Sequence, residues 1–219
     1  MLRYLIALLS FASPARACEL ALLLAVDVSG SVDPQEYRIQ MGGLAAALRD
    51  GSVADALVEQ GAQVALIQWT GSSRQRQTVP WTKMRSHADV LTLADTIEGD
   101  ARIWRNFSTA VGEALEVARA AFGPVSHCTR RVIDVSGDGT SNEGIDPITQ
   151  RPLLRADEVT VNAIAIETDD ADLTAYFFEN VLVGPGAFVV TANGFADYPE
   201  QIKRKLQRET TRQVTSNNK

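Results

Sequence analysis

Oxygen-bearing side chains gather in three loops of this sequence, and no cysteine or histidine stands among them. The groups are Asp27, Ser29 and Ser31; Asn106, Ser108 and Thr109; and Asp138, Thr140, Ser141 and Asn142. In the spacing Asp-x-Ser-x-Ser, alternate residues of an extended segment point to the same side, so their oxygens can aim at one point. Oxygen ligands alone favour Mg²⁺, Mn²⁺ or Ca²⁺ over zinc or copper. The pattern therefore predicts a divalent-cation site.

The charge of such a site limits what it can do by itself. Two carboxylates nearly neutralise a divalent cation, so the chain's own ligands would hold the metal weakly. An anionic oxygen from outside would complete an octahedron of ~2.1 Å bonds and add charge stabilisation. The site is thus predicted to hold an acidic group of a partner. Taken singly, Asp27, Ser29 and Ser31 also fit a helix-capping turn, because Asp and Ser are common where a strand leads into a helix.

Short apolar runs alternate with helical patterns along the chain. Leu20–Val26 is a continuous apolar run, as in a strand covered on both faces, and Asp33-Pro34 opens a helix after it. Further strands are predicted at 64–69, 75–81, 131–135, 159–166 and 187–191, and helices at 89–97, 109–121, 153–158, 171–181 and 198–208. Pro80 suits a sheet edge. This order predicts a three-layer, Rossmann-like open α/β sheet, mostly parallel with one antiparallel edge strand and with helices on both faces. In such a sheet, ligands gather beyond the carboxyl ends of the strands, where the three polar loops would meet.

At these loops the sequence resembles the von Willebrand factor A family, known also from integrin inserted domains. The match is Asp27-x-Ser29-x-Ser31, then Thr109 leading Thr-Ala-Val-Gly-Glu-Ala-Leu, then Asp138 in Ser-Gly-Asp-Gly. The resemblance implies a metal-ion-dependent adhesion site in which Ser29 and Ser31 bind the metal directly, Thr109 directly or through water, and Asp27 and Asp138 mostly through water. More narrowly, the chain is similar to a bacterial exported family with no assigned activity. The implied function is a cation-dependent protein-binding module, for adhesion or as a scaffold, whose partner presents an Asp or Glu.

The two ends of the chain differ from the middle. Residues 1–17 have a positive start at Arg3, an apolar run and the small residues of Ala15-Arg16-Ala17, which is typical of a secretory signal peptide. An uncleaved anchor or a buried first strand are the alternatives. We expect a domain at 18–209, a disordered tail at 210–219, a periplasmic or secreted location and no membrane span, since no apolar stretch reaches the ~20 residues that a span needs.

Export changes how the two cysteines are interpreted, because thiols in an oxidising compartment tend to pair. Cys18 and Cys128 each come just before a predicted strand, so both could lie at one edge of a parallel sheet, and we predict a disulfide between them. Lipidation of Cys18 stays open as an alternative. His87 and His127 lack ligand spacing and are expected to be solvated loop residues.

Composition excludes some classes of function. With a formal charge of −6 and scattered basic residues, nucleic acid is not an expected partner, and we expect a monomer. The first strand leads into Asp-Val-Ser-Gly-Ser, which provides no glycine-rich cradle for a dinucleotide. A metal-dependent envelope hydrolase or phosphatase using Asp27 is the alternative to the binding module, against the expectation of no enzyme activity. Residues 104–107 could form an aromatic and cationic rim for the partner or pack in the core, whereas Trp69 and Trp81 are expected to pack on the sheet.

Overall fold

A six-stranded sheet runs through the centre of the computed structural model, which describes residues 17–168 and 172–211. The strands are β1 (Leu20–Asp27), β2 (Gln63–Trp69), β3 (Gln75–Lys83), β4 (Arg130–Gly137), β5 (Val159–Ile166) and β6 (Val189–Ala192), in the order β3-β2-β1-β4-β5-β6. Only the pairing of β3 with β2 is antiparallel; the other strand pairs are parallel. The predicted sheet, with its antiparallel edge strand, is confirmed.

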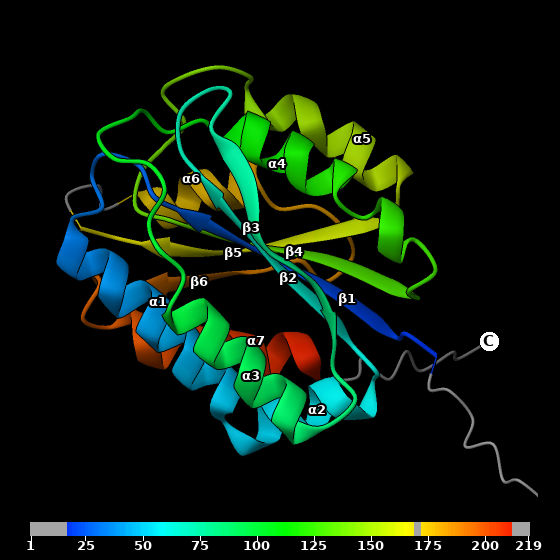
Figure 1. Cartoon of the computed structure of the whole chain (residues 1–219). Helices are drawn as coiled ribbons and strands as arrows, with labels where there is room; N and C mark the ends of the chain where they lie inside the picture. The colour runs from blue at the N-terminus through cyan, green and yellow to red at the C-terminus, as the bar shows by residue number, and fades with distance from the viewer. Residues whose placement is uncertain (1–16, 169–171, 212–219) are drawn as a thin grey trace, which may run out of the picture.

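Helices cover both faces of this sheet (Figure 1). One face carries α1 (Pro34–Arg49), α2 (Gly51–Glu59), α3 (His87–Glu98) and α7 (Tyr198–Thr210); the other carries α4 (Val111–Ala120), α5 (Arg151–Ala156) and α6 (Leu173–Asn180). Short 3-10 turns lie at η1 (Gly123–Val125) and η2 (Pro147–Gln150). The three-layer α/β arrangement is therefore as expected. Helix α2 was not predicted from the sequence; it follows α1 after the single residue Asp50. This residue ends one helix and caps the next by accepting a hydrogen bond from Ser52 N at 3.0 Å.

The apolar side chains of β1 pack into two hydrophobic cores, one on each face of the sheet. Leu20, Leu22 and Leu24 belong to the core beneath α1, α3 and α7, whereas Ala21 and Leu23 belong to the core beneath α4 and α6. Successive side chains of a strand point to opposite faces, so a central strand covered on both sides needs apolar residues at every position. The polar loop follows directly after Asp27, the last residue of β1.

The loop after β1 leads into a helix whose start is well defined. Asp33 accepts hydrogen bonds from Gln35 N at 2.6 Å and Glu36 N at 2.8 Å, while its own backbone N donates to Glu36 Oε2 at 2.7 Å. This capping box satisfies backbone groups that the first turn of a helix leaves free. The predicted start of the helix at Pro34 is confirmed, and the polar loop is held between two fixed ends.

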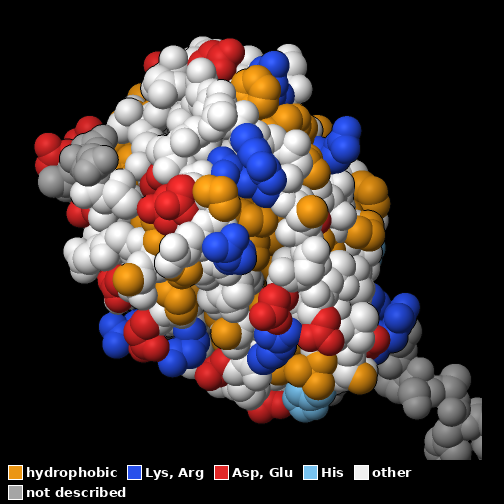
Figure 2. Space-filling view, turned by 60° about the vertical axis from the view of Figure 1, so that its left-hand side comes forward, with side chains coloured by type: hydrophobic (Ala, Val, Ile, Leu, Met, Phe, Trp, Pro, Cys, Tyr) orange, Lys and Arg blue, Asp and Glu red, His pale blue; other side chains and the backbone are white. Residues whose placement is uncertain are grey.

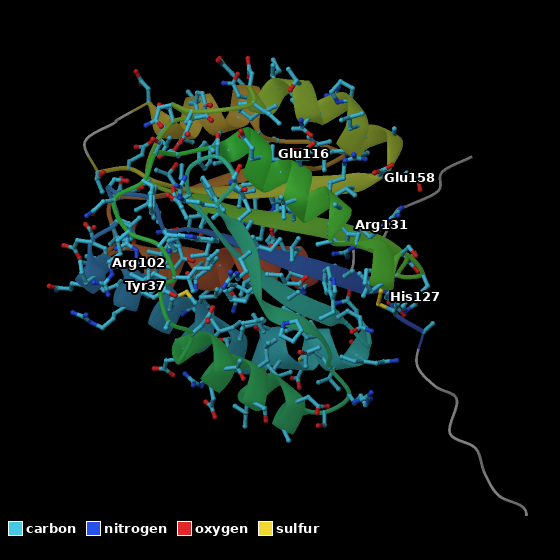
Figure 3. All side chains as sticks on the ribbon, turned by 45° about the horizontal axis from the view of Figure 1, so that its top comes forward. Tyr37, Arg102, Glu116, His127, Arg131 and Glu158 are labelled. Carbon is cyan, nitrogen blue, oxygen red and sulfur yellow. A yellow bond between two sulfur atoms is a disulfide. The ribbon has the colours of Figure 1, made fainter. Side chains whose placement is uncertain are left out.

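A disulfide joins the segments that lead into β1 and β4, at the edge of the sheet opposite to the polar loops. Cys18 and Cys128 are bonded across a sequence separation of 110 with a Cα–Cα distance of 4.7 Å, as predicted. Their backbones are adjacent because Thr129 N donates to Cys18 O at 3.1 Å, just before β1 and β4 begin to pair. His127 is exposed beside the bond (Figure 3). Because both sulfurs are bonded to each other, this group offers no thiolate to a metal ion.

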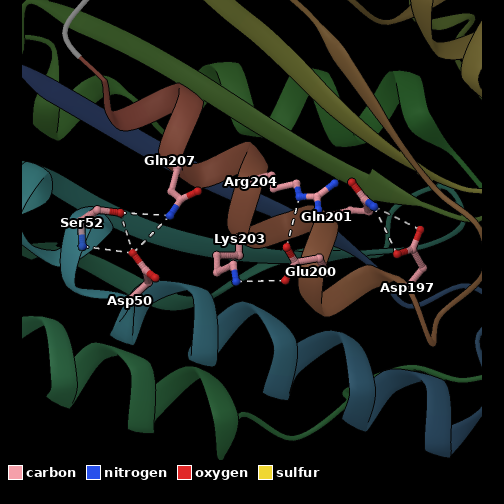
Figure 4. Close-up of polar contacts among 8 residues, drawn as sticks. All are labelled: Asp50, Ser52, Asp197, Glu200, Gln201, Lys203, Arg204 and Gln207. Carbon is pink, nitrogen blue, oxygen red and sulfur yellow. Dashed lines mark hydrogen bonds and ion pairs between the residues drawn. The ribbon is translucent and has the colours of Figure 1, made fainter.

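Helix α7 is fixed to the sheet by buried charges. Lys205 Nζ lies 2.5 Å from Asp134 Oδ1 of β4 and 2.5 Å from Glu209 Oε1, and all three side chains are buried. Outside this cluster, Gln207 Nε2 of α7 donates to Ser52 Oγ of α2 at 3.1 Å (Figure 4). The helix is thus tied both to β4 of the sheet and to the neighbouring α2.

Some predicted segments fall outside the described residues. These are the signal peptide at 1–17 except Ala17, the tail at 210–219 except Thr210 and Thr211, and the first residue of the helix predicted at 171–181. Within residues 17–168 and 172–211, no helix combines the length and apolar character required to cross a membrane.

Candidate metal centre

Two central strands end side by side at the polar loops. β1 pairs with β4 as far as Val26 and Ser136, so Asp27 and Asp138 emerge next to each other at the carboxyl edge of the sheet. The chain passes from β1 to β2 on one side and reaches β4 on the other, which makes this the switch point of the topology. At such a point the loops diverge and leave room for a ligand.

Hydrogen bonds link four of the predicted site residues. Ser29 N donates to Asp27 Oδ1 at 2.7 Å, Ser29 Oγ and Ser31 Oγ lie 3.1 Å apart, and Ser31 Oγ donates to Asp138 Oδ1 at 2.7 Å. Asp27, Ser29 and Asp138 are buried, whereas Ser31 is exposed. The structure therefore brings residues from the β1 and β4 loops together, with one hydroxyl open to the outside.

Thr109 approaches from the third loop. Its backbone N donates to Asn142 Oδ1 at 2.9 Å, and its carbonyl accepts from Asn142 N at 2.9 Å, which joins the loop before α4 to the loop after β4. Its Oγ1 lies 3.8 Å from where a Cβ on Gly139 would stand, so the hydroxyl faces the residue next to Asp138. The helix was predicted to begin near Thr109, but α4 begins at Val111, because these hydrogen bonds hold Thr109 outside it.

The two carboxyl groups of the site are buried, and the charge of Arg102 offsets the effect of this burial only in part. Burial is the main cause that raises the pKa of Asp27 from 3.8 to about 8, and the charge of Asp138 adds to it. Burial likewise raises the pKa of Asp138, against the lowering effect of its hydrogen bond from Ser31. Asp27 Oδ2 is buried, and no described residue donates a hydrogen bond to it. A buried carboxylate oxygen of this kind is costly unless a positive charge or a donor reaches it.

Three residues near the site were missed by the sequence analysis. Arg102 donates through Nη2 to Val28 O at 2.9 Å and Ser29 O at 2.7 Å, so it holds the β1 loop by its backbone (Figure 3). Gln40 of α1 donates to Asp27 O at 3.0 Å, and the charge of Glu36 helps raise the pKa of Asp138. In the sequence, these residues are marked only by lying near a predicted ligand along the chain. That position does not reveal in which direction a side chain points.

The aromatic residues divide between core and surface. Trp69 is fully buried, and Trp81 packs on Phe122 with ring centroids 5.4 Å apart, so both lie against the sheet as expected. Trp104 is partly buried against the core beneath α1, whereas Phe107 is 37% exposed. In the segment 104–107, Trp104 therefore packs partly in the core, whereas Phe107 lies partly on the surface. Figure 2, in which the carboxyl edge of the sheet comes forward, shows basic and apolar side chains next to each other on this face.

An open depression of about 470 Å³ lies on the other flank of the site. It is lined by polar and acidic residues of the loop after β4 and by α6: Ser141, Asn142, Glu143, Asp146, Tyr176 and Asn180 are among them. Ser141 N donates to Tyr176 Oη at 3.2 Å, which fixes the loop against α6. The site is therefore bordered by a basic and aromatic flank and by an acidic flank.

The donor set fits a hard divalent cation. The clustered side-chain oxygens include two carboxyl groups and three hydroxyls, with neither sulfur nor imidazole among the predicted ligands. The unpaired Asp27 Oδ2 and the raised pKa of Asp27, which the charge of Arg102 lowers only in part, mark a place where further positive charge would stabilise the fold. The exposed Ser31 shows that the cluster is reached from outside rather than sealed in the core.

Comparison with known proteins places the chain in a family. A sequence model described as "Protein of unknown function (DUF1194)" matches residues 17–214. No curated protein matches the sequence.

Several solved structures share the architecture. Proximal thread matrix protein 1 from the mussel byssus, in a structure with a zinc-occupied MIDAS (metal-ion-dependent adhesion site) motif, has a TM-score of 0.67 and 19% identity over 89% of this chain and 46% of its own. The pilus adhesin SpaC from Lactobacillus rhamnosus GG has a TM-score of 0.64 and 12% identity over 90% of this chain and 31% of its own. A von Willebrand factor type A protein from Catenulispora acidiphila has a TM-score of 0.61 and 17% identity over 90% of this chain and 44% of its own. The chain spans less than half the length of each of them, and it shares the von Willebrand factor A fold with them.

Proposed function

The chain belongs to the DUF1194 family, and we propose that it acts as a divalent-cation-dependent binding module of the periplasm or cell exterior, which captures a carboxylate of a protein partner. Ser29 and Ser31 would bind the metal directly, Thr109 directly or through water, and Asp27 and Asp138 mostly through water. Magnesium is the expected ion, with Mn²⁺ or Ca²⁺ as alternatives, because every donor is a hard oxygen.

One observation carries this proposal: the buried, unpaired Oδ2 of Asp27 beside the second acid Asp138. Burying two carboxyl groups at the end of a hydrophobic strand destabilises the domain unless something compensates for their charge. The guanidinium of Arg102 donates its hydrogen bonds to backbone oxygens, and its charge lowers the pKa of Asp27 by less than burial raises it. A retained cost of this kind is typical of a functional site.

The residues of the chain prepare the site for an acidic partner. The hydrogen bonds among Asp27, Ser29, Ser31 and Asp138 hold the donor oxygens together before anything binds. When bound, a divalent cation supplies the positive charge to which a carboxylate from outside can attach. The mussel protein with zinc at its MIDAS motif supports metal binding on this fold, although the oxygen donors here favour magnesium.

Export fits the same function. The signal-peptide pattern at residues 1–17 and the disulfide between Cys18 and Cys128 both suit an oxidising compartment outside the cytoplasm. SpaC, a pilus adhesin with the same fold, supports a role at the cell surface.

The alternative of a hydrolase using Asp27 finds less support. The side chain of Asp27 is fully buried and its Oδ1 already accepts a hydrogen bond from Ser29 N, so a substrate has poor access to it. No described lysine or histidine side chain is hydrogen-bonded to Asp27 or Asp138 as a general acid or base would be.

Metal titration of the full chain tests the proposal. We expect isothermal titration with MgCl₂ and MnCl₂ to show one site per chain, which is abolished by Asp138→Ala and unchanged by Ser126→Ala, an exposed serine outside the site. Partner capture is then measured by affinity purification with the wild type in magnesium, the wild type in EDTA and Asp138→Ala. Recovery of the same proteins in all three conditions would contradict the proposed function, as would magnesium-dependent turnover of a phosphate ester that is lost in Asp27→Asn.

A further inference from the structure

A group of arginines borders the candidate metal centre on one flank. We define the basic rim as Arg74, Arg76, Arg102 and Arg105 together with the rings of Trp104 and Phe107. Its two segments, residues 71–85 and 101–109, contain no Asp or Glu, although the whole chain has a formal charge of −6. Carboxylates of other segments reach the first of them, where Glu143 Oε2 accepts from Ser72 N at 3.3 Å and Asp100 Oδ2 accepts from Thr78 Oγ1 at 2.5 Å. The rim therefore has four arginines on segments without acids of their own.

The rim is joined firmly to the site. Phe107 O accepts a hydrogen bond from Gly30 N at 2.8 Å, and a Cβ on Gly30 would lie 3.2 Å from that same oxygen, so glycine suits this close approach. The buried Gln68 holds the start of the segment, donating to Ala101 O at 3.0 Å and accepting from Ile103 N at 3.1 Å. The rim thus has a fixed position relative to Ser29 and Ser31.

The rings arrange the guanidinium groups. Arg74 Cζ lies 3.9 Å from the centroid of Phe107, and Arg76 Cζ lies 6.0 Å from the centroid of Trp104. Stacking on a ring satisfies a guanidinium face while its N–H groups remain available around the edge. Arginine in this arrangement suits carboxylates, which it can bind with two parallel hydrogen bonds.

The rim arginines are not committed to acids of their own chain. Among the described residues, the ion pairs of arginine involve Arg49, Arg119, Arg131 and Arg204, and none involves the rim. Arg102 is occupied by the carbonyls of Val28 and Ser29. Arg74 donates through Nη1 to Ser72 O at 3.2 Å. The exposed Arg76 and Arg105, together with the remaining N–H groups of Arg74, are therefore left to face a partner.

The other flank repels the same kind of ligand. Asp146 lines the depression beside the loop after β4, and Asp33 and Glu36 stand at the start of α1, whereas Glu143 reaches from that depression to Ser72 N of the rim's own segment at 3.3 Å. An acidic ligand that reaches the site would therefore extend over the rim and away from these carboxylates.

We propose that the partner presents an acid-rich polypeptide segment, with one carboxylate on the bound metal and at least two more on Arg74, Arg76 and Arg105. This inference rests on the proposed function and narrows its partner from any protein with an exposed Asp or Glu to one with a run of them. The metal would bind one carboxylate of the partner segment. The arginines of the rim would bind the carboxylates next to it, so they determine how many acidic residues the segment needs and in which direction it extends.

Synthetic peptides test the number of carboxylates. The probes are fluorescein-labelled peptides of Gly and Ser that have equal length and carry five Asp, one Asp with four Asn, or five Asn. Their affinity for the full chain is measured by fluorescence anisotropy in MgCl₂ and in EDTA, at low and at high salt concentration. The variants are Arg76→Gln/Arg105→Gln, both exposed, and the matched control Arg155→Gln, exposed on α5.

We expect the five-Asp peptide to bind about tenfold more tightly than the one-Asp peptide in magnesium. The double variant should lose about that factor and part of the salt dependence for the five-Asp peptide, while its affinity for the one-Asp peptide stays within about twofold. Arg155→Gln should change neither. Equal affinity of the two peptides, or equal losses for both in the double variant, would overturn the inference, as would tighter binding of a sulfated oligosaccharide of matched charge.

The peptides also separate the two proposals. If EDTA and Asp138→Ala leave binding unchanged while the double variant still weakens binding of the five-Asp peptide and not of the one-Asp peptide, the rim is supported and the metal-dependent function is overturned. If EDTA abolishes binding of both acidic peptides and the double variant affects them equally, the metal-dependent function is supported and the rim is overturned.

Discussion

Removing the charge of Asp27 should stabilise the metal-free protein. In the fold without metal, the pKa of Asp27 is raised from 3.8 to about 8, first by burial and then by Asp138. The folded state therefore binds a proton that the unfolded state has lost throughout this pH window, so the stability contributed by this group falls as pH rises from about 4 to about 8. The variant Asp27→Asn cannot ionise and is free of this loss.

The size of the effect follows from the shift. Each unit of pKa corresponds to about 1.4 kcal/mol, so a shift of about four units sets an upper bound of about 6 kcal/mol at a pH of about 8. Local relaxation and water entry reduce such penalties, and we expect a gain of about 2–4 kcal/mol for Asp27→Asn in EDTA. For a domain of this size that is a rise in Tm of roughly 4–16 °C. The amide oxygen that the substitution introduces can still accept the hydrogen bond from Ser29 N.

Urea denaturation at about pH 5 and about pH 8, with EDTA and with magnesium, checks this. The wild type should lose stability between the two pH values in EDTA and regain it with magnesium, whereas Asp27→Asn should respond weakly to both. Glu116→Gln, at an exposed glutamate on α4, is the control and should follow the wild type. A less stable Asp27→Asn in EDTA at the higher pH would refute the reasoning, because it would mean that the unpaired carboxylate already has a compensating partner in the metal-free fold.

Three further changes test the structure around the site. Burial and the charge of Asp134 raise the pKa of Glu209 from 4.5 to about 8, so the stability that this group contributes is lost as pH rises through that window. In urea denaturation, Glu209→Gln should therefore reduce the slope of the unfolding free energy against pH by up to about 1.4 kcal/mol per pH unit. Replacing Cys18 and Cys128 together by serine opens a link across 110 residues and should cost about 2–5 kcal/mol, whereas an equal stability of the variant and the wild type under oxidising conditions would argue against the bond. A Cβ on Gly112 would overlap the carbonyl oxygen of Ile145, so Gly112→Ala should lower thermal stability by about 1–3 kcal/mol; Gly42→Ala, where nothing lies within 4 Å, should raise it by about 0.5–1 kcal/mol, and the opposite order would contradict the packing.

The rim and the buried acids affect different properties of the same site. Arg76 and Arg105 lie on the surface, so their loss should change affinity and salt dependence with little effect on folding. Asp27 and Asp138 are buried at the strand ends, so their substitution should change metal binding and stability together. Measuring both properties for every variant keeps a folding defect from being mistaken for a loss of recognition.

The sequence alone determined the main elements and the candidate ligands. The run Leu20–Val26 predicted a buried central strand because a strand with two covered faces favours apolar residues at successive positions. Asp33-Pro34 predicted the start of α1 because capping depends on residues only three apart. The spacing of Asp27, Ser29 and Ser31 after that strand, and the position of Cys18 and Cys128 before two strands, likewise depend on local order along the chain.

Only the tertiary structure decided what surrounds these residues. It placed Arg102 on the carbonyls of the β1 loop, left Asp27 Oδ2 without a donor among the described residues, and joined Lys205 of α7 to Asp134 of β4. It also separated Thr109 from the helix that the pattern had included it in. These features depend on the direction of individual side chains and on segments far apart in sequence, and the free energy of such contacts is set by burial and distance, which periodicity and spacing do not encode.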